Sequence, residues 1–223
     1  MKRAKRDEKM QQVIQKLIAK IDADPYDQES YYALGTALTE EKSFTQAEEL
    51  FKKALNALSD RAEKTELLHY GLGNVYYASE LYDEAIAQFN LVQDGKLQAQ
   101  AYTMLAQSYY AKANYQKALV FALTASEKLR SVTTLSLMGD CFLALGNFGP
   151  AKDYYQQALQ LEPNDARINF QLGVIAVVNG ADPTAYFERA KQSDPKLYQT
   201  LKTRLNDVEQ TMQATTKKKK GGR

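Results

Sequence analysis

The sequence predicts an all-α protein built as a solenoid of stacked helix hairpins. Two observations support this: a period of about 34 residues, and apolar residues at three- and four-residue spacing inside each period. The 223 residues are 44% hydrophobic and 25% charged, which is sufficient for a packed core. Only 5 Pro and 11 Gly are present, and no run resembles a linker. We therefore expect one continuous unit.

The period is marked by a large apolar residue followed by a small one. The pairs are Leu34-Gly35, Leu72-Gly73, Leu105-Ala106, Met138-Gly139 and Leu172-Gly173, separated by 38, 33, 33 and 34 residues. Further positions keep the same register. Thirteen residues after the large apolar residue stand Ala47, Ala85, Ala118 and Ala151, and seventeen after it stand Phe51, Phe89, Ala122 and Tyr155. Small residues would let paired helices approach closely, while the aromatic rings fill the remaining space.

The pattern places five hairpins in order along the chain, because one hairpin cannot bury its own apolar face and stacked copies can. The expected repeats cover about 28–61, 66–98, 99–131, 132–165 and 166–195. A basic tail at 1–6 precedes a capping helix at 7–24, and a second capping helix follows at 196–213. These elements form a single predicted domain over 7–213. The basic segment 214–223 has no periodicity and is expected to be disordered.

Three departures from the period carry their own expectations. The first link is four residues longer than the period, so a loop or an extended helix is expected from Ser59 to Lys64. The third repeat has Ala122 where the others carry a large aromatic residue. The fifth repeat is short by two residues, and its second helix should begin tightly, with Pro183 tolerated in the first turn.

The repeat resembles the tetratricopeptide repeat (TPR). The match is clearest in the fourth copy, where eight residues occupy the family's spacing: Leu135, Met138, Gly139, Phe142, Ala151, Tyr155, Ala158 and Pro163. The resemblance spans about 28–195. It implies a right-handed superhelical α-solenoid with N- and C-terminal capping helices, and a role in protein–protein interaction.

The resemblance also implies where a partner would bind. In the TPR family the first helices of successive repeats line a concave groove, at fixed offsets from the large apolar residue. Those offsets select the following candidates: Tyr32, Thr36, Tyr70, Asn74, Tyr77, Thr103, Gln107, Tyr110, Asp140, Leu143, Phe170 and Val174. This set is rich in tyrosine, weakly charged in the middle and apolar towards the C-terminal end.

Two interpretations of these positions stay open. The tyrosines could anchor a peptide, since they combine a large apolar area with a polar tip, or they could only pack against neighbouring helices. Val174, Val177 and Val178 could be covered by the terminal helix or by a second copy. Of the Lys and Asn residues with which some TPR proteins hold a C-terminal carboxylate, only Asn74 is present. We therefore do not expect a carboxylate clamp.

Catalytic, metal and cofactor sites are not expected. The chain holds one His and one Cys, and His69 and Cys141 fall in different repeats, too far apart to form a nucleophile–base pair. We expect His69 to be a packed or half-buried core residue. Cysteine and histidine do not cluster at metal-ligand spacing, and phosphate-binding glycine motifs are missing. The sequence thus predicts a protein that is not an enzyme and has no cofactor.

Charge is divided between the ends and the body of the chain. Both ends are basic, through Lys2, Arg3, Lys5 and Arg6 and through 217–220 with Arg223. Without these nine residues, 20 basic residues face 27 acidic ones, so the body carries −7. This balance argues against a nucleic-acid partner. A single cysteine, no recognisable signal peptide and no membrane-length apolar run predict a cytoplasmic protein.

The sequence therefore predicts a non-catalytic scaffold or adaptor that binds a peptide or a partner helix in the concave groove. Two alternatives remain: a nucleic-acid-associated protein that uses its basic tails, and a self-associating helical-repeat assembly factor. The partner's identity and the choice between monomer and homodimer are not determined by the sequence.

Overall fold

The computed structural model describes residues 2–59, 65–93, 95 and 97–220, and in these residues it contains helices and no strands. The expected loop from Ser59 to Lys64 lies, apart from Ser59, outside them. The helices are α1 (Lys2–Ala23), α2 (Gln28–Glu40), α3 (Phe44–Ala57), α4 (Glu66–Ala78), α5 (Tyr82–Phe89), α6 (Gln98–Ala111), α7 (Tyr115–Lys128), α8 (Val132–Ala144), α9 (Phe148–Leu161), α10 (Ala166–Val178), α11 (Thr184–Ser193) and α12 (Pro195–Lys220).

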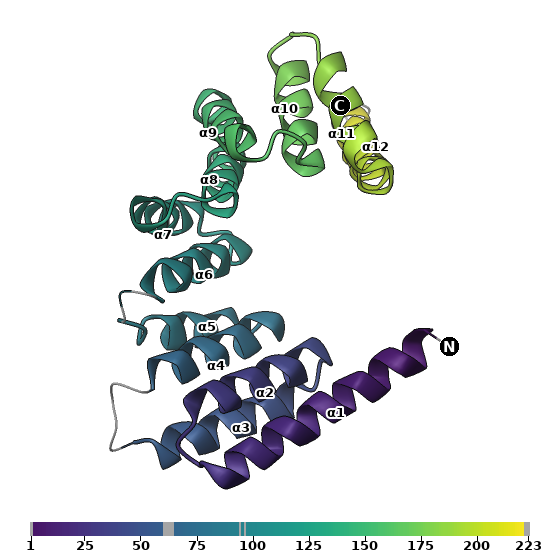
Figure 1. The fold of residues 1–223 in the computed structure, drawn as a ribbon. Helices are drawn as coiled ribbons and strands as arrows, with labels where there is room; N and C mark the ends of the chain where they lie inside the picture. Colours follow the sequence, from purple (N-terminus) through teal and green to yellow (C-terminus); the bar gives the residue numbers. More distant parts are fainter. Residues whose placement is uncertain (1, 60–64, 94, 96, 221–223) are drawn as a thin grey trace. The chain divides into compact units, whose positions relative to one another are not determined.

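The helices form two compact units, each a short stack of hairpins (Figure 1). Unit 1, residues 1–130, contains α1 and the pairs α2–α3, α4–α5 and α6–α7. Unit 2, residues 131–223, contains the pairs α8–α9 and α10–α11, followed by α12. Inside each unit, the second helix of one pair contacts the first helix of the next. This stacking confirms the all-α, helical-repeat solenoid that the period predicts.

Each hairpin turns through a residue in the left-handed backbone region, eight positions after the large apolar residue. These residues are Lys42, Glu80, Ala113, Gly146 and Gly180, with φ between 56° and 76°. In the first hairpin the N–H of Ser43 donates to the carbonyl of Leu38, and that of Lys42 donates to Thr39. This Schellman-type pattern satisfies the last carbonyls of α2. Lys42, Glu80 and Ala113 adopt it despite the steric cost of a Cβ atom.

The two helices of a hairpin are held together by an aromatic ring on a glycine. A Cβ atom added at Gly73 would lie 2.5 Å from the Phe89 ring, and one at Gly139 would lie 2.6 Å from Tyr155. Phe51 is 1% exposed and fits between two glycines, Gly35 of its own repeat and Gly71 of the next. The small residue and the aromatic residue that recur in each repeat of the sequence therefore make the contact that sets the spacing between the paired helices.

The third repeat fills the same space in another way. Ala122 is fully buried, but its methyl group is too small to fill the space that an aromatic ring fills in the other repeats. The preceding residue, Phe121, instead stacks on Tyr109 and Tyr102 of α6, with ring centroids 5.3 and 6.1 Å apart. The missing aromatic residue is thus replaced by its neighbour in sequence.

The terminal helices are longer than the sequence analysis expects. α1 begins at Lys2 and α12 continues to Lys220, so residues 2–6 and 214–220 are helical rather than irregular. The physical reason is composition, because these segments contain Ala, Lys, Arg and Thr but no Gly or Pro before Gly221. α11 is short, with 10 residues against 14 in α9, and Pro183 stands at its N-cap.

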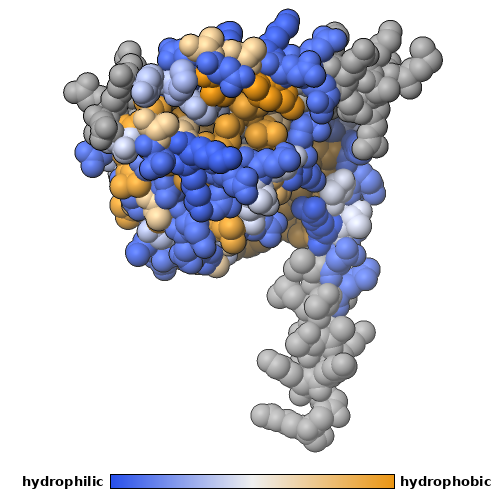
Figure 2. All heavy atoms as spheres, turned by 90° about the horizontal axis from the view of Figure 1, so that it is seen from below, coloured by the Kyte–Doolittle hydropathy of each residue, from blue (hydrophilic) through white to orange (hydrophobic). Residues whose placement is uncertain are grey.

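The two terminal helices differ in how well their apolar residues are covered. In residues 11–23 of α1 no side chain is fully buried, and Val13 and Ile18 remain 47% and 45% exposed. Figure 2 views this end of unit 1 and shows apolar side chains open among polar ones. The exposed residues at 196–207 of α12 are all polar or charged. Whether the chain is a single domain over 7–213 stays a prediction.

Candidate functional site

The first helices of unit 1 form a continuous face, because α4 contacts both α2 and α6. Eight of the candidate residues lie on these three helices, and every one is partly buried: Tyr32, Thr36, Tyr70, Asn74, Tyr77, Thr103, Gln107 and Tyr110. None of the eight is charged. We call this face the tyrosine surface.

Tyr70 lies at the centre of the tyrosine surface. Its ring centroid lies 6.4 Å from that of Tyr32 and 5.8 Å from that of Phe89, which is a core residue. Burial raises the pKa of the Tyr70 phenol, and the Tyr32 phenol adds to this, while a hydrogen bond with Asn74 acts in the opposite direction. Tyr70 therefore has a structural role in the core as well as an accessible edge.

Two further tyrosines are each supported by a tyrosine from the following helix. Tyr77 meets Tyr82 edge-to-face at 5.6 Å, and Tyr110 meets Tyr115 at 5.3 Å. Burial raises the pKa of Tyr77, with a further contribution from Tyr82. These contacts restrict the orientation of the two rings within unit 1.

The polar candidates differ in what their side chains already do. The Thr103 hydroxyl donates to the carbonyl of Ala99 in its own helix, at 2.9 Å. Thr36 and Gln107 are half-buried on α2 and α6. Gln107 carries both a donor and an acceptor, as a partner's main chain requires.

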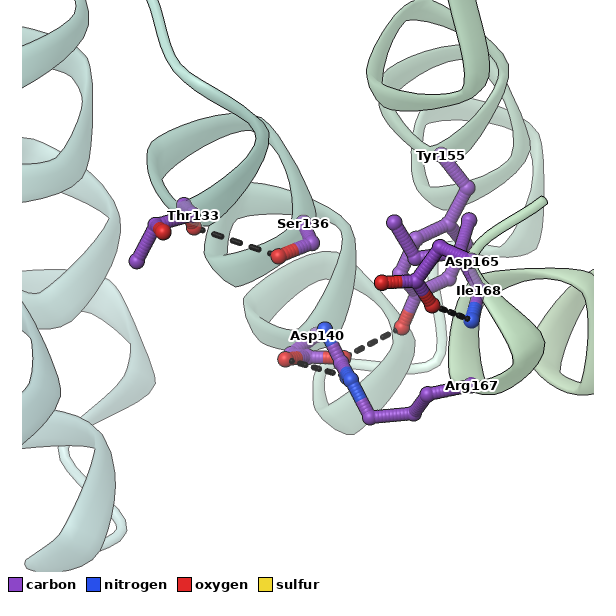
Figure 3. A network of polar contacts seen from close by, with 7 residues as sticks. All are labelled: Thr133, Ser136, Asp140, Tyr155, Asp165, Arg167 and Ile168. Atoms are coloured by element: carbon purple, nitrogen blue, oxygen red, sulfur yellow. Dashed lines mark hydrogen bonds and ion pairs between the residues drawn. The ribbon is translucent and has the colours of Figure 1, made fainter. Parts of the chain in front are cut away.

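In unit 2, Asp140 joins three helices. Its carboxylate accepts a 2.6 Å hydrogen bond from the Tyr155 hydroxyl on α9, and Arg167 on α10 donates to both of its oxygens at 2.8 and 3.0 Å (Figure 3). The Asp140 side chain is only 16% exposed. The charge and hydrogen bonds of Asp140 outweigh burial and raise the pKa of Arg167. The carboxylate of Asp140 is therefore already engaged by a side chain of its own repeat and by one of the next repeat.

The apolar candidates of unit 2 have different environments. Phe170 is 5% exposed and packs against Phe187 and Tyr198, with ring centroids at 5.3 and 5.8 Å. It is a core residue that joins α10 to α11 and α12. Leu143 and Val174 are partly buried.

The exposed valines at the end of α10 answer a question that the sequence left open. The terminal helix covers Phe170, yet Val177 and Val178 remain 52% and 54% exposed within unit 2. α12 therefore does not bury this pair.

Three matches to models of the tetratricopeptide repeat now identify the fold family. They cover residues 28–57, 70–128 and 132–165, together more than half of the chain. The chain belongs to the tetratricopeptide-repeat family. Repeats of this family are typically modules of protein interaction, which agrees with the broad class that the sequence predicts.

Solved TPR structures share the fold at low sequence identity. PilF of Pseudomonas aeruginosa has a TM-score of 0.68 at 19% identity, over 89% of this chain and 99% of its own. YrrB has a TM-score of 0.61 at 20% identity, over 84% and 97%. A MamA structure has a TM-score of 0.62 at 21% identity, over 76% and 92%. No curated protein matches the sequence significantly.

The residues of possible chemical interest are engaged or buried in this TPR chain. His69 is half-buried, as the sequence predicts, and its Nδ1 lies 2.9 Å from Oε1 of Gln88. Cys141 is fully buried, and burial raises the pKa of its thiol to about 12, with a further contribution from Asp140. Among the residues that the structure describes, no three His, Cys, Asp or Glu side chains are grouped to hold a metal, and no helix has the length and hydropathy needed to cross a membrane.

Sequence reasoning missed three residues that shape these TPR surfaces. Tyr82 and Tyr115 are not among the candidate residues, yet their rings support Tyr77 and Tyr110. Arg167 is not among the candidate residues either, although its ion pair engages the carboxylate of Asp140. The available signal is an Arg in the first turn of a repeat whose preceding repeat carries an Asp, since this combination allows an ion pair between the two repeats.

Proposed function

We propose that this TPR protein is a non-catalytic scaffold that binds an extended, uncharged segment of a partner protein along the tyrosine surface of unit 1. The observation that carries the proposal is the row formed by Tyr70, Tyr77 and Tyr110, whose rings are held in place by other aromatic residues. Rigid aromatic side chains with polar tips supply much of the binding energy at protein interfaces.

The chemistry of this surface favours a peptide over a charged ligand. The tyrosine rings offer apolar area for side chains, and Gln107 offers an amide that can pair with a peptide bond. No charged side chain belongs to the set, so a phosphorylated or strongly acidic partner would lose its hydration without gaining a counter-ion. Asn74 already bonds to Tyr70 and would act mainly by orienting that phenol.

Two further observations support a binding role. One similar structure, YrrB, is described as a TPR protein with an unusual peptide-binding site. His69 and Cys141, the residues a nucleophilic enzyme would use, are respectively bonded to Gln88 and buried. We also propose a cytoplasmic location, since the single cysteine is a buried thiol that needs no oxidising compartment.

The test is selection of peptides from a random display library on the purified full chain. Peptides that bind should be uncharged and should lose at least about tenfold in affinity on the Tyr77→Ala/Gln107→Ala variant, as expected for loss of an aromatic anchor and a hydrogen bond. Tyr70 is left intact because its truncation would disturb the core at Phe89.

A matched control is the Val120→Ala/Leu123→Ala variant, which alters two exposed apolar residues on α7, away from the tyrosine surface. It should bind the selected peptides as the wild type does, and circular dichroism should show the same helicity for both variants. Equal binding by the Tyr77→Ala/Gln107→Ala variant would refute the assignment of the surface.

A further inference from the structure

Tyrosines recur at equivalent positions in successive repeats of the tyrosine surface. Tyr32 and Tyr70 share one position, two residues before the large apolar residue of the repeat. Tyr77 and Tyr110 share another, five residues after it. All four side chains are partly buried and so keep an accessible part. The surface therefore presents similar rings at intervals that the repeat itself sets.

These intervals match the pitch of one kind of peptide conformation. Tyr70 and Tyr77 lie seven residues apart on α4, which is a rise of about 10 Å. Tyr77 and Tyr110 lie at equivalent positions of two contacting helices, and helices in contact have axes about 8–10 Å apart. A polyproline II helix advances about 9 Å in a three-residue turn and then presents the same edge again. Each step between these tyrosines is thus about one such turn.

Other peptide conformations fit the tyrosine surface less well. Side chains on one face of a β-strand recur at about 6.6 Å and then at about 13 Å, so a strand misses the spacing. An α-helix does return to the same face after about 10 Å, but its own carbonyls are already bonded. Polyproline II has no internal hydrogen bonds, and its carbonyls are open to donors. Donors on the surface therefore distinguish polyproline II from a helix.

The tyrosine surface carries donors for such carbonyls. Gln107, which is half-buried on α6, has two amide N–H groups. Burial raises the pKa of the Tyr70 phenol, whereas the hydrogen bond with Asn74 lowers it, as expected when the amide is the donor. The Tyr70 oxygen accepts that bond, so its own hydrogen can be donated to a partner.

We propose that the partner of the tyrosine surface is a proline-rich segment in the polyproline II conformation, which crosses α2, α4 and α6 with a proline at every third residue. This inference rests on the function proposed above and specifies the chemistry of the partner. Aromatic-lined grooves accept proline rings, and a polyproline II segment is ordered before it binds, which lowers the entropic cost. Proline also has no N–H group that would need an acceptor.

The first experiment titrates the purified full chain with a blocked peptide of about ten prolines, which spans three turns, in an isothermal calorimeter. The peptide should bind saturably, and its affinity should fall at least about tenfold on the Tyr77→Ala/Gln107→Ala variant. A blocked Gly/Ser peptide of the same length, which is uncharged and flexible, should not bind. Absence of binding by the proline peptide, or equal binding by the variant, overturns the proposal.

A second variant tests the hydrogen bond to the partner's carbonyl. Tyr70→Phe keeps the ring beside Tyr32 and Phe89 but removes the donor, so the proline peptide should bind about three- to tenfold more weakly. Tyr154→Phe is the matched control, because this tyrosine lies in unit 2 and stacks on Phe142. It should bind as the wild type does. An unchanged affinity for Tyr70→Phe overturns the polyproline II assignment in favour of a helical partner.

The library selection described above separates this inference from the proposed function. Selected peptides that require Tyr77 and Gln107 but lack proline at three-residue spacing would leave the tyrosine surface as a binding site and overturn the proline-rich partner. A library that yields no binder, together with no binding of the proline peptide, overturns both.

Discussion

At the scale of the residue, the fold depends on pairing a glycine with a ring. Gly73 lies on Phe89, Gly139 on Tyr155 and Gly173 on Phe187. The third repeat has Ala106 and Ala122 at the equivalent places, so the first position is larger there and the second is smaller. Helix spacing in a hairpin is therefore set by the two residues together.

This pairing predicts that the effect of Gly73→Ala changes sign with its partner. In the wild type, the new Cβ atom would meet the Phe89 ring, and overpacking of this kind costs about 1–3 kcal/mol. In a Phe89→Ala background the clash is gone, and the better helix propensity of Ala should stabilise the protein by about 1 kcal/mol. Urea denaturation of the four proteins of this cycle measures both values.

Gly149→Ala is the matched control, because nothing lies within 4 Å of a Cβ atom at that helical position. It should be neutral or slightly stabilising. A Gly73→Ala change with the same effect in both backgrounds would show that Phe89 does not set the limit.

At the scale of the element, neighbouring repeats of unit 2 are joined by a polar contact as well as by apolar packing. Asp140 of α8 accepts a hydrogen bond from Tyr155 of α9 and forms an ion pair with Arg167 of α10. A different ion pair, Lys112 with Asp83, joins repeats in unit 1, but there the carboxylate is 78% exposed. The two pairs should therefore differ in energetic value.

We expect Asp140→Asn to destabilise the protein by about 1–3 kcal/mol, since it removes the charge from a carboxylate that is only 16% exposed and accepts hydrogen bonds from Tyr155 and Arg167. Asp83→Asn should change the stability by less than about 1 kcal/mol, because water and salt screen the exposed pair. Thermal melts followed by circular dichroism at low and high salt make the comparison. Equal losses for the two variants would contradict this difference.

At the scale of the whole molecule, the period alone predicts the order of the hairpins, because the same residues recur in register from Leu34 to Leu172. It does not predict the fate of single groove positions. Asp140 meets a residue 27 positions later, and Phe170 becomes core through Tyr198 of the last helix. Such contacts depend on which helices meet in space, and that is not contained in a repeat pattern. The extended ends of α1 and α12 reflect local propensity, which a search for periodicity overlooks.

The single cysteine provides a chemical readout of unfolding. Because burial raises the pKa of Cys141 to about 12, the folded thiol keeps its proton where an unfolded one, with an ordinary pKa of about 8.5, begins to lose it. The native protein should therefore react with iodoacetamide at pH 8 far more slowly than the protein in urea. The contribution of this group to stability should decline as the pH rises above about 9.

A Cys141→Ser/Gln156→Cys variant, with its thiol on the exposed side of α9, serves as the reference for labelling. It should be modified rapidly in both states, which separates accessibility from reagent chemistry. Rapid labelling of native Cys141 at the reference rate would mean that α8 opens readily.

The position of Phe51 between Gly35 and Gly71 has a consequence for truncated forms of the protein. The ring is part of the first repeat in sequence, but it also packs against the first helix of the second repeat. The two repeats should therefore unfold together, although a repeat boundary separates them in sequence. A fragment that begins at Thr65 would lose the ring that covers Gly71 and would expose the buried side of α4. Nearest-neighbour coupling of this kind makes the smallest fragment that can fold on its own larger than one repeat. A truncated form should therefore end between two neighbouring hairpins that are not joined by a shared aromatic ring.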